Sequence, residues 1–276
     1  MDKIKELNMT MKKFRWSYKE TTLNILLDRE EALESIKRSV IENRIRLEDY
    51  IEKNPLFKVS LVPIDVDEDS PDIVREMAHA SKKVGVGPMA CVAGAFSEFS
   101  CKSALNHAKN ILVENGGDIY IHGERDFKIG IYAGHSKFSN RIGFYINEES
   151  LPIGICTSSG TVGHSISFGE SDATVVVAKS AILADAAATA IGNVVRGKKG
   201  LKKGLNFAKK IEGIEGVLII HENRLGAWGN LPEIIDVREE RAEFFVRTQN
   251  IDDPEGNIHK KRPNTKEHEV VRNTLL

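Results

Sequence analysis

The chain has 276 residues, a formal net charge of −1, and ordinary shares of apolar (41%) and charged (29%) residues. This length and apolar content suit one sizeable globular domain. Near-neutral charge argues against a dedicated nucleic-acid-binding protein, because such proteins carry a surplus of basic residues.

The cysteines and the apolar stretches bear on the cellular setting. Cys91, Cys101 and Cys156 are odd in number and include no CxxC pair, which argues against a disulfide framework or zinc knuckle. The N-terminal segment has no apolar core of signal-peptide length. No stretch reaches the roughly 18–20 apolar residues of a membrane span. We therefore expect a cytoplasmic protein without a membrane segment.

In chain order, the first half predicts a hairpin followed by alternating helices and strands. The expected elements are a hairpin at 14–28, a charged helix at 29–53 with Asp28 as N-cap, a strand at 57–65, a helix from the N-cap Ser70 to Gly85, a small-residue helix at 88–110, and strands at 111–123 and 127–134.

The second half follows the same plan loosely. It predicts strands at 152–159 and 173–181, a small-residue helix at 181–197 closed by Gly197, and a helix, a buried strand and a turn over 201–229. We expect an α+β fold with two related βαβ-type halves around a central cleft, in one domain at 1–236. Residues 237–276 are charged and poor in apolar side chains, so they predict an extension, partly flexible or docked on a protein partner.

Two glycine-containing segments could bring a backbone close to a ligand. Residues 87–99, GPMACVAGAFSEF, are rich in small side chains, which allow close approach either of a flat ligand or of a neighbouring helix or sheet. In ENGGDIYIHG, Gly116 and Gly117 precede Asp118 inside a strand pattern. The pair predicts a bulge or a ligand contact, and a simple tight turn explains it equally well.

A loop rich in hydroxyl groups, CTSSGTVGHSISFGES, spans residues 156–171. Hydroxyls and exposed backbone N–H groups can hold phosphate, and a histidine can move a proton near neutral pH. The alternative is a polar surface loop. The candidate cofactor-binding residues of this loop are Thr157, Ser158, Ser159, Gly160 and Thr161, and the candidate catalytic residue is His164.

The small-residue helix at 181–197 carries the candidate metal ligands. Asp185 and Thr189 are four residues apart, so they share one face of the helix. Oxygen ligands of this kind suit Mg²⁺. Alternatively, Asp185 caps or hydrogen-bonds a neighbouring loop.

No H-E-x-x-H, G-x-S-x-G or G-x-x-x-x-G-K-[ST] motif occurs, which argues against zinc proteases, serine hydrolases of the elbow type and P-loop proteins.

Together, GPMACVAGAFSE, ENGGDIYI, PIGICTSSGTVGHSISFG, ADAAATAIGN and LGAWG resemble an uncharacterised ApbE-like family within the Mg²⁺-dependent FAD:protein FMN transferase superfamily. The resemblance covers about 14–231. It implies an α+β fold with the ligand between two halves, FAD or FMN as the cofactor, and Mg²⁺ held by Asp185, Thr189 and the backbone carbonyl of Ala90. It also implies a link with homocysteine formation from sulfide in anaerobes.

The chain departs from the transferases at two motifs. Ala93 stands where the transferases have the lysine of AKG, and HSISFGES replaces HIIDPRTG while keeping His164. Loss of the lysine removes a cationic partner for phosphates. Three interpretations therefore remain open. One is a Mg²⁺-assisted enzyme of flavin transfer or sulfur assimilation. Another is a flavin- or nucleotide-binding accessory subunit, either a homo-oligomer or bound to another protein, without transferase activity. The third is a purely structural protein with small-residue packing motifs.

Overall fold

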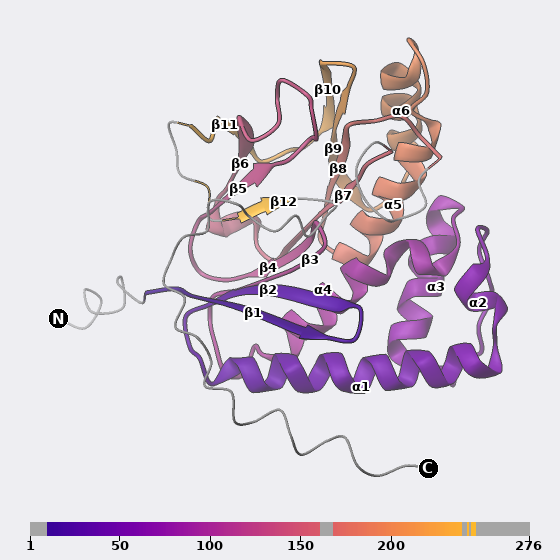
Figure 1. The fold of residues 1–276 in the computed structure, drawn as a ribbon, viewed down its shortest axis with the longest axis vertical. Coiled ribbons are helices and arrows are strands. Elements are labelled where there is room, and N and C mark those ends of the chain that lie inside the picture. The colour runs from indigo at the N-terminus through magenta and orange to yellow at the C-terminus, as the bar shows by residue number, and fades with distance from the viewer. Residues whose placement is uncertain (1–9, 161–167, 239–241, 243, 247–276) are drawn as a thin grey trace, which may run out of the picture.

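An antiparallel sheet of eight strands forms the middle layer of the molecule (Figure 1). The computed structural model describes residues 10–160, 168–238, 242 and 244–246. The strands of this sheet, in spatial order, are β1 (Lys12–Tyr18), β2 (Thr21–Leu27), β3 (Ile111–Asn115), β4 (Asp118–His122), β7 (Ile153–Ser158), β8 (Ala173–Ala178), β9 (Ile214–His221) and β10 (Arg224–Gly229).

Helices cover one face of this sheet, on the right and lower side of Figure 1. They are α1 (Ala32–Lys53), α2 (Leu56–Val59), α3 (Asp72–Val84), the 3₁₀ helix η2 (Pro88–Cys91), α4 (Val92–Ser103), α5 (Ala181–Val194) and α6 (Gly200–Ala208). The apolar side chains of these helices and of the sheet form one core, which includes Val113, Val176 and Ile191. Burial of this surface is the main stabilising term of the helical layer.

A second, four-stranded sheet covers the opposite face. It consists of β11 (Glu233–Asp236), β6 (Ile142–Ile146), β5 (Phe127–Ile131) and β12 (Phe244–Val246), in that order, and the short helix η3 (Glu148–Ser150) follows β6. A separate core lies between the sheets, with Ile155, Phe127 and Phe144 among its members. Because β7 and β8 face a core on each side, all their residues are buried.

Each half of the large sheet has the same plan. A hairpin, a helical segment and a second hairpin follow one another, first as β1–β2, α1 to α4 and β3–β4, and then as β7–β8, α5–α6 and β9–β10. The strands that flank the helices, β2 with β3 and β8 with β9, pair directly and antiparallel. The predicted mixed fold of helix and sheet is confirmed. The helices of each half connect antiparallel strands, whereas a βαβ crossover connects parallel ones.

The strand predicted at 57–65 is wrong. Residues 56–59 form the short helix α2, and a loop follows. Phe57 is buried and packs edge-on against Tyr50 of α1, with ring centroids 5.2 Å apart. The backbone of Ser60 lies so close to Gly87 that a Cβ there would be 1.8 Å from the Ser60 oxygen. Tertiary packing of one aromatic ring thus decides the local structure.

Two predicted N-caps are also wrong. Glu31 occupies the N-cap position of α1, and Pro71 occupies that of α3. The carboxylate of Asp28 instead accepts hydrogen bonds from the backbone N–H groups of Lys109 (3.3 Å) and Asn110 (3.0 Å). The side chain therefore joins β2 to the segment before β3. The predicted end of α3 is correct, since Gly85 has the left-handed φ of 78° typical of a C-cap.

The start of the predicted 237–276 extension contributes to the small sheet. Residues 244–246 form β12, which pairs in parallel with β5. The extension as a separate unit stays a prediction.

In the described part of the chain, no single helix is long and apolar enough to cross a membrane. One pair, Asp72–Val84 with Pro88–Ser103, meets that length and composition only jointly and is bent by 102°.

Candidate functional site

Helices α4 and α5 cross at Gly94, and this crossing places the candidate site. A Cβ at Gly94 would be 2.4 Å from the carbonyl oxygen of Ala181 and 2.8 Å from Cβ of Asp185. The absence of a side chain lets the α4 backbone reach α5. As a result, the N–H of Gly94 donates a hydrogen bond to Oδ2 of Asp185 at 2.9 Å, across 91 positions of sequence.

Asp185 is a buried carboxylate on an otherwise small and apolar helix. Its exposed fraction is 7%. Burial raises the pKa of Asp185 to about 7, against the opposing effect of hydrogen bonds from the N–H groups of Gly94 and Ala93. The carboxylate therefore changes its charge near neutral pH, and a cation beside it would favour the ionised form.

A second buried carboxylate, Asp118, lies near Asp185. Asp118 begins β4, and its Oδ1 accepts a hydrogen bond from the backbone N–H of Thr157 at 3.2 Å. Burial and then the charge of Asp185 raise the pKa of Asp118 well above its usual range. The structure thus brings together two of the sequence-predicted site residues from different halves of the fold.

Thr189 and Ala90 also meet. The hydroxyl of Thr189, one turn beyond Asp185 on α5, donates to the carbonyl oxygen of Ala90 in η2 at 3.4 Å. Both residues are half-buried, so they lie nearer the surface than Asp185. A carboxylate, a hydroxyl and a backbone carbonyl, all of them oxygen donors, therefore line the junction of α5 with the η2–α4 segment.

The candidate residues of β7 divide between two faces of the sheet. Cys156 belongs to the core under the helices, and Ile155 belongs to the core between the sheets. Since side chains alternate along a strand, Ser158 faces α5 and Thr157 faces the small sheet. A Cβ at Gly192 of α5 would lie 3.5 Å from Oγ of Ser158, in agreement with this direction. Thr157 faces away from Asp185, and its hydroxyl has no hydrogen-bond partner in the part of the chain that the structure describes.

Ser159 and Gly160 follow β7 and lead toward the loop that contains the candidates Thr161 and His164. Those two residues lie outside the described residues. The described ends of the loop lie against α5. The N–H of Gly160 donates to the carbonyl of Ser171 at 3.0 Å, and the N–H of Phe168 donates to Oδ1 of Asn193 at 2.9 Å.

Gly116 and Gly117 form the two-residue turn between β3 and β4. Their φ angles are 62° and 104°, and Asn115 pairs with Asp118 across the turn. Positive φ at both central positions is the geometry of a tight hairpin turn, which glycine adopts without strain. Of the two interpretations of this segment, the tight turn is therefore the one observed. The turn therefore fixes the position of Asp118, the first residue of β4.

Sequence reasoning missed Glu98, which positions the start of α5. This buried carboxylate accepts hydrogen bonds from the hydroxyl of Ser180 at 2.8 Å and from the N–H of Ile182 at 3.2 Å. An acidic group at a helix N-terminus satisfies otherwise unpaired N–H groups and suits the helix dipole. Its only sequence signal was a charged residue within a run of small ones.

Burial of the two cysteines near this junction disfavours their thiolate form, which is the reactive one. Cys91 and Cys156 are buried free thiols, and burial raises the pKa of each well above its ordinary value.

Among the described residues, no three His, Cys, Asp or Glu side chains are grouped so as to hold a metal ion. Asp185, Thr189 and the Ala90 carbonyl offer oxygen donors, the ligand type that hard cations prefer.

The fold of eight antiparallel strands, a helical layer and a small second sheet is that of ApbE flavin transferases. The apo flavinyl transferase ApbE of Pseudomonas stutzeri superposes with a TM-score of 0.53 at 13% identity, over 80% of this chain and 94% of that one. At 13% sequence identity, this structural similarity establishes the class of fold.

The chain belongs to the family described as "AbpE bacteria", whose model matches residues 5–210. Its relatives include UPF0280 protein MJ1526 of Methanocaldococcus jannaschii, 44% identical over 82% of this chain and 95% of the relative. A UPF0280 protein of Methanococcus vannielii is 43% identical over 83% and 94% of the two chains. The resemblance inferred from the sequence motifs is confirmed.

Proposed function

We propose that this protein binds a flavin nucleotide, FAD or FMN, through its phosphate groups, and that a Mg²⁺ ion assists this binding. The observation that supports the proposal most directly is the meeting of Asp185 with the Gly94 amide, beside the contact of Thr189 with Ala90. The family membership and the fold class favour a flavin over other phosphate-bearing ligands.

The residues present fit a magnesium ion. Asp185, Thr189 and the carbonyl of Ala90 offer the oxygen donors that Mg²⁺ prefers, and α5 holds the first two on one face. A buried carboxylate needs a compensating partner to remain ionised. When bound, the metal would neutralise phosphate charge. Asp118 lies beside this set and helps to hold the strand that carries Ser158.

The loop after β7 supplies the remaining groups of the proposed site. Ser158, Ser159, Gly160 and Thr161 offer hydroxyl and N–H groups for phosphate, and His164 is proposed as the general acid or base. The tight turn at Gly116–Gly117 contributes by fixing Asp118. The same site could serve flavin transfer or homocysteine formation from sulfide, the two reactions that the sequence resemblance implies.

The second candidate is a flavin-binding accessory protein without transferase activity. Ala93 favours this function, because the transferases have a lysine at the matching position. The backbone carbonyl of Ala93 accepts a hydrogen bond from the side chain of Asn115 at 3.3 Å, at the end of the β3–β4 hairpin. A methyl side chain cannot supply charge to a phosphate there.

Fluorescence titration tests the binding proposal. FAD and FMN are each added to the full chain with Mg²⁺ and with a chelator, and quenching of flavin fluorescence reports binding. We expect Mg²⁺ to strengthen FAD binding at least tenfold, and Asp185→Asn to remove this dependence. Asp72→Asn, an exposed carboxylate at the start of α3, is the control. Equal FAD affinity with and without Mg²⁺ would contradict the metal role, and no binding of either flavin would contradict the flavin.

A transfer assay separates the two candidates. The chain is incubated with FAD, Mg²⁺ and a flavin-acceptor peptide, and the peptide is weighed by mass spectrometry. A mass gain equal to FMN indicates a transferase. Flavin binding without a mass gain in the peptide indicates the accessory function, and formation of homocysteine from added sulfide and a suitable carbon donor indicates the sulfur reaction.

A further inference from the structure

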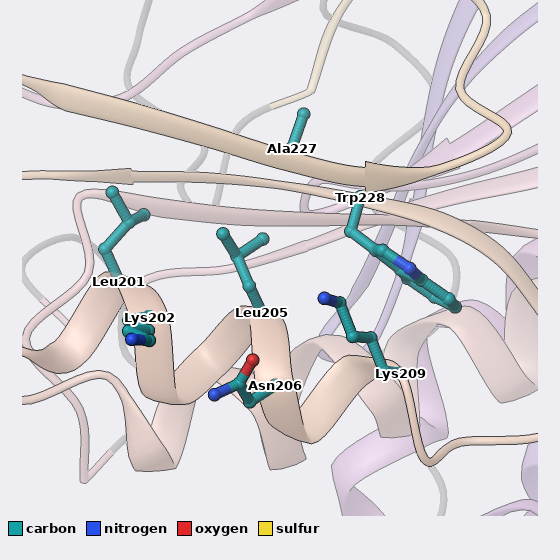
Figure 2. Close-up of a pocket in the computed structure, with 7 residues that line it drawn as sticks. All are labelled: Leu201, Lys202, Leu205, Asn206, Lys209, Ala227 and Trp228. Carbon is teal, nitrogen blue, oxygen red and sulfur yellow. The ribbon is translucent and has the colours of Figure 1, made fainter.

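A groove between α6 and β10 lies outside the proposed flavin site. It has a volume of about 330 Å³ (Figure 2). Leu201 and Leu205 of α6 point toward β10 and form its apolar part, together with the half-buried ring of Trp228. The other residues that line it are Lys202, Asn206, Lys209 and Ala227.

The helix of this groove belongs to a dense basic segment, of which Lys202 and Lys209 line the groove. Residues 196–210 contain seven basic residues and no acidic one, although the whole chain has a net charge of −1. All seven are exposed, namely Arg196, Lys198, Lys199, Lys202, Lys203, Lys209 and Lys210. None forms an ion pair with another residue in the described part of the chain. Clustered charge of one sign attracts a partner surface of the opposite sign.

The chain itself carries the complementary pattern at α2 and the loop after it. Four large apolar side chains there are strongly exposed, Leu56 (72%), Val59 (67%), Leu61 (57%) and Val62 (63%). Four exposed acidic residues follow, Asp65, Asp67, Glu68 and Asp69, with no basic residue among them. Among the described residues, Asp65 alone of these four forms an ion pair, with Lys82 at 2.5 Å. Contiguous exposed apolar residues of this kind mark interaction surfaces.

We infer that the protein self-associates, and that the α2 segment, residues 56–69, of one copy docks in the α6–β10 groove of a second copy. The apolar side chains of the segment would cover Leu201, Leu205 and Trp228. Its carboxylates would face the α6 lysines. One contact then accounts for an exposed apolar patch, for an acidic run in which Asp67, Glu68 and Asp69 form no ion pair among the described residues, and for a basic run with none.

Both surfaces belong to the helical layer, α6 toward the top and α2 lower on the right in Figure 1. A two-fold axis between two copies would therefore let each copy's segment meet the other's groove. Such an arrangement forms the contact twice and closes as a dimer. Two contacts also double the buried area, which a stable interface needs because a single small contact is too weak.

Analytical ultracentrifugation of the full chain at micromolar concentration tests the inference. We expect the wild type to sediment at twice its chain mass of 30.7 kDa. One variant reverses the groove charges by Lys202→Glu, Lys203→Glu and Lys209→Glu. The other reverses the loop charges by Asp67→Lys, Glu68→Lys and Asp69→Lys. Each variant alone should be monomeric, since like charges then face each other in both contacts.

Mixing the two variants provides the decisive measurement. In a mixed pair, the acidic groove faces the basic loop, and the basic groove faces the acidic loop, so the dimer should return. This outcome also shows that both variants fold. The matched control carries Lys12→Glu, Lys109→Glu and Lys137→Glu at exposed positions outside both surfaces, and it should stay dimeric.

Other outcomes would overturn the inference. They are a monomeric wild type, a dimer that survives both charge reversals, or a mixture of the variants that stays monomeric. A monomeric wild type whose groove lysines retain RNA or anionic vesicles would assign the basic run to another partner. Flavin titration of the same variants keeps the test separate from the proposed function, because both reversed surfaces lie outside the proposed flavin site.

Discussion

The two faces of β7 differ in what they bury, although both are closed to solvent. On the side of the helices, Ser158 and its neighbours lie in the same buried layer as the carboxylates of Asp118 and Asp185. Both carboxylates accept hydrogen bonds from backbone N–H groups. Toward the small sheet, β7 buries Ile153, Ile155 and the Thr157 hydroxyl, which has no hydrogen-bond partner among the described residues. Small residues explain the difference. Gly94 brings a backbone amide within reach of the Asp185 carboxylate on the helical face, whereas the described residues bring no hydrogen-bond partner to the Thr157 hydroxyl on the other face.

The largest expected effect tests the close approach of the helices. Gly94→Ala places a Cβ 2.4 Å from the Ala181 oxygen, so the helices must separate. We expect a loss of about 3 kcal/mol in the free energy of unfolding, at the upper end for overpacked cores. Urea unfolding followed by circular dichroism measures it.

Gly192→Ala is the matched control on α5. Its added Cβ would meet nothing closer than 3.5 Å. Because alanine favours a helix over glycine, the control should be neutral or more stable by up to about 1 kcal/mol. Equal losses in both variants would mean that the helix crossing at Gly94 is not as close as described.

The second prediction concerns the charge buried on the helical face. The folded pKa of Asp185, about 7, lies above its ordinary 3.8. The folded state therefore holds a proton that the unfolded state has released, and stability falls as pH rises from about 4 to about 7. With chelator present, we expect this fall to be smaller in Asp185→Asn by roughly 2 kcal/mol, since a buried carboxylate no longer ionises.

Urea unfolding at several pH values gives this difference. Asp72→Asn, which removes an exposed carboxylate, should keep the wild-type profile. Parallel profiles for wild type and Asp185→Asn would contradict the raised pKa. Added Mg²⁺ should flatten the wild-type profile alone, if the proposed metal ligands are correct.

The smallest expected changes in stability come from removing one buried hydroxyl on each side of the large sheet. Thr157→Val replaces a buried hydroxyl, to which the described residues offer no partner, by a methyl group of similar shape, so stability should stay equal or rise by about 1 kcal/mol. Ser97→Ala removes a hydroxyl that donates to the carbonyl of Asp118 at 2.7 Å and should lower stability by about 1 kcal/mol.

Thermal unfolding of the two variants in one buffer provides the comparison. A destabilised Thr157→Val would show that its hydroxyl has a partner that the described contacts do not include. Flavin titration of the same variant should give an unchanged affinity, because the Thr157 side chain faces away from Asp185.

The sequence by itself determined the local elements whose signals are short-range. The opening hairpin, the helix ended by Gly85, the two small-residue helices and the pairing of Asp185 with Thr189 on one helix face follow from spacing and residue type. The motifs also identified the family, because their order along the chain is specific even where each one is short.

Only the tertiary structure decided the contacts between distant segments. It turned the predicted strand at 57–65 into a helix and a loop, since Phe57 is buried against Tyr50. It also brought Gly94 to Asp185 and the N–H of Thr157 to Asp118. These pairs lie 91 and 39 residues apart, and local propensity holds no information on which backbone amide meets a given carboxylate. Close packing of Gly94 against the alanine-rich helix selects the partner of Asp185, and the pairing of β4 with β7 selects the partner of Asp118.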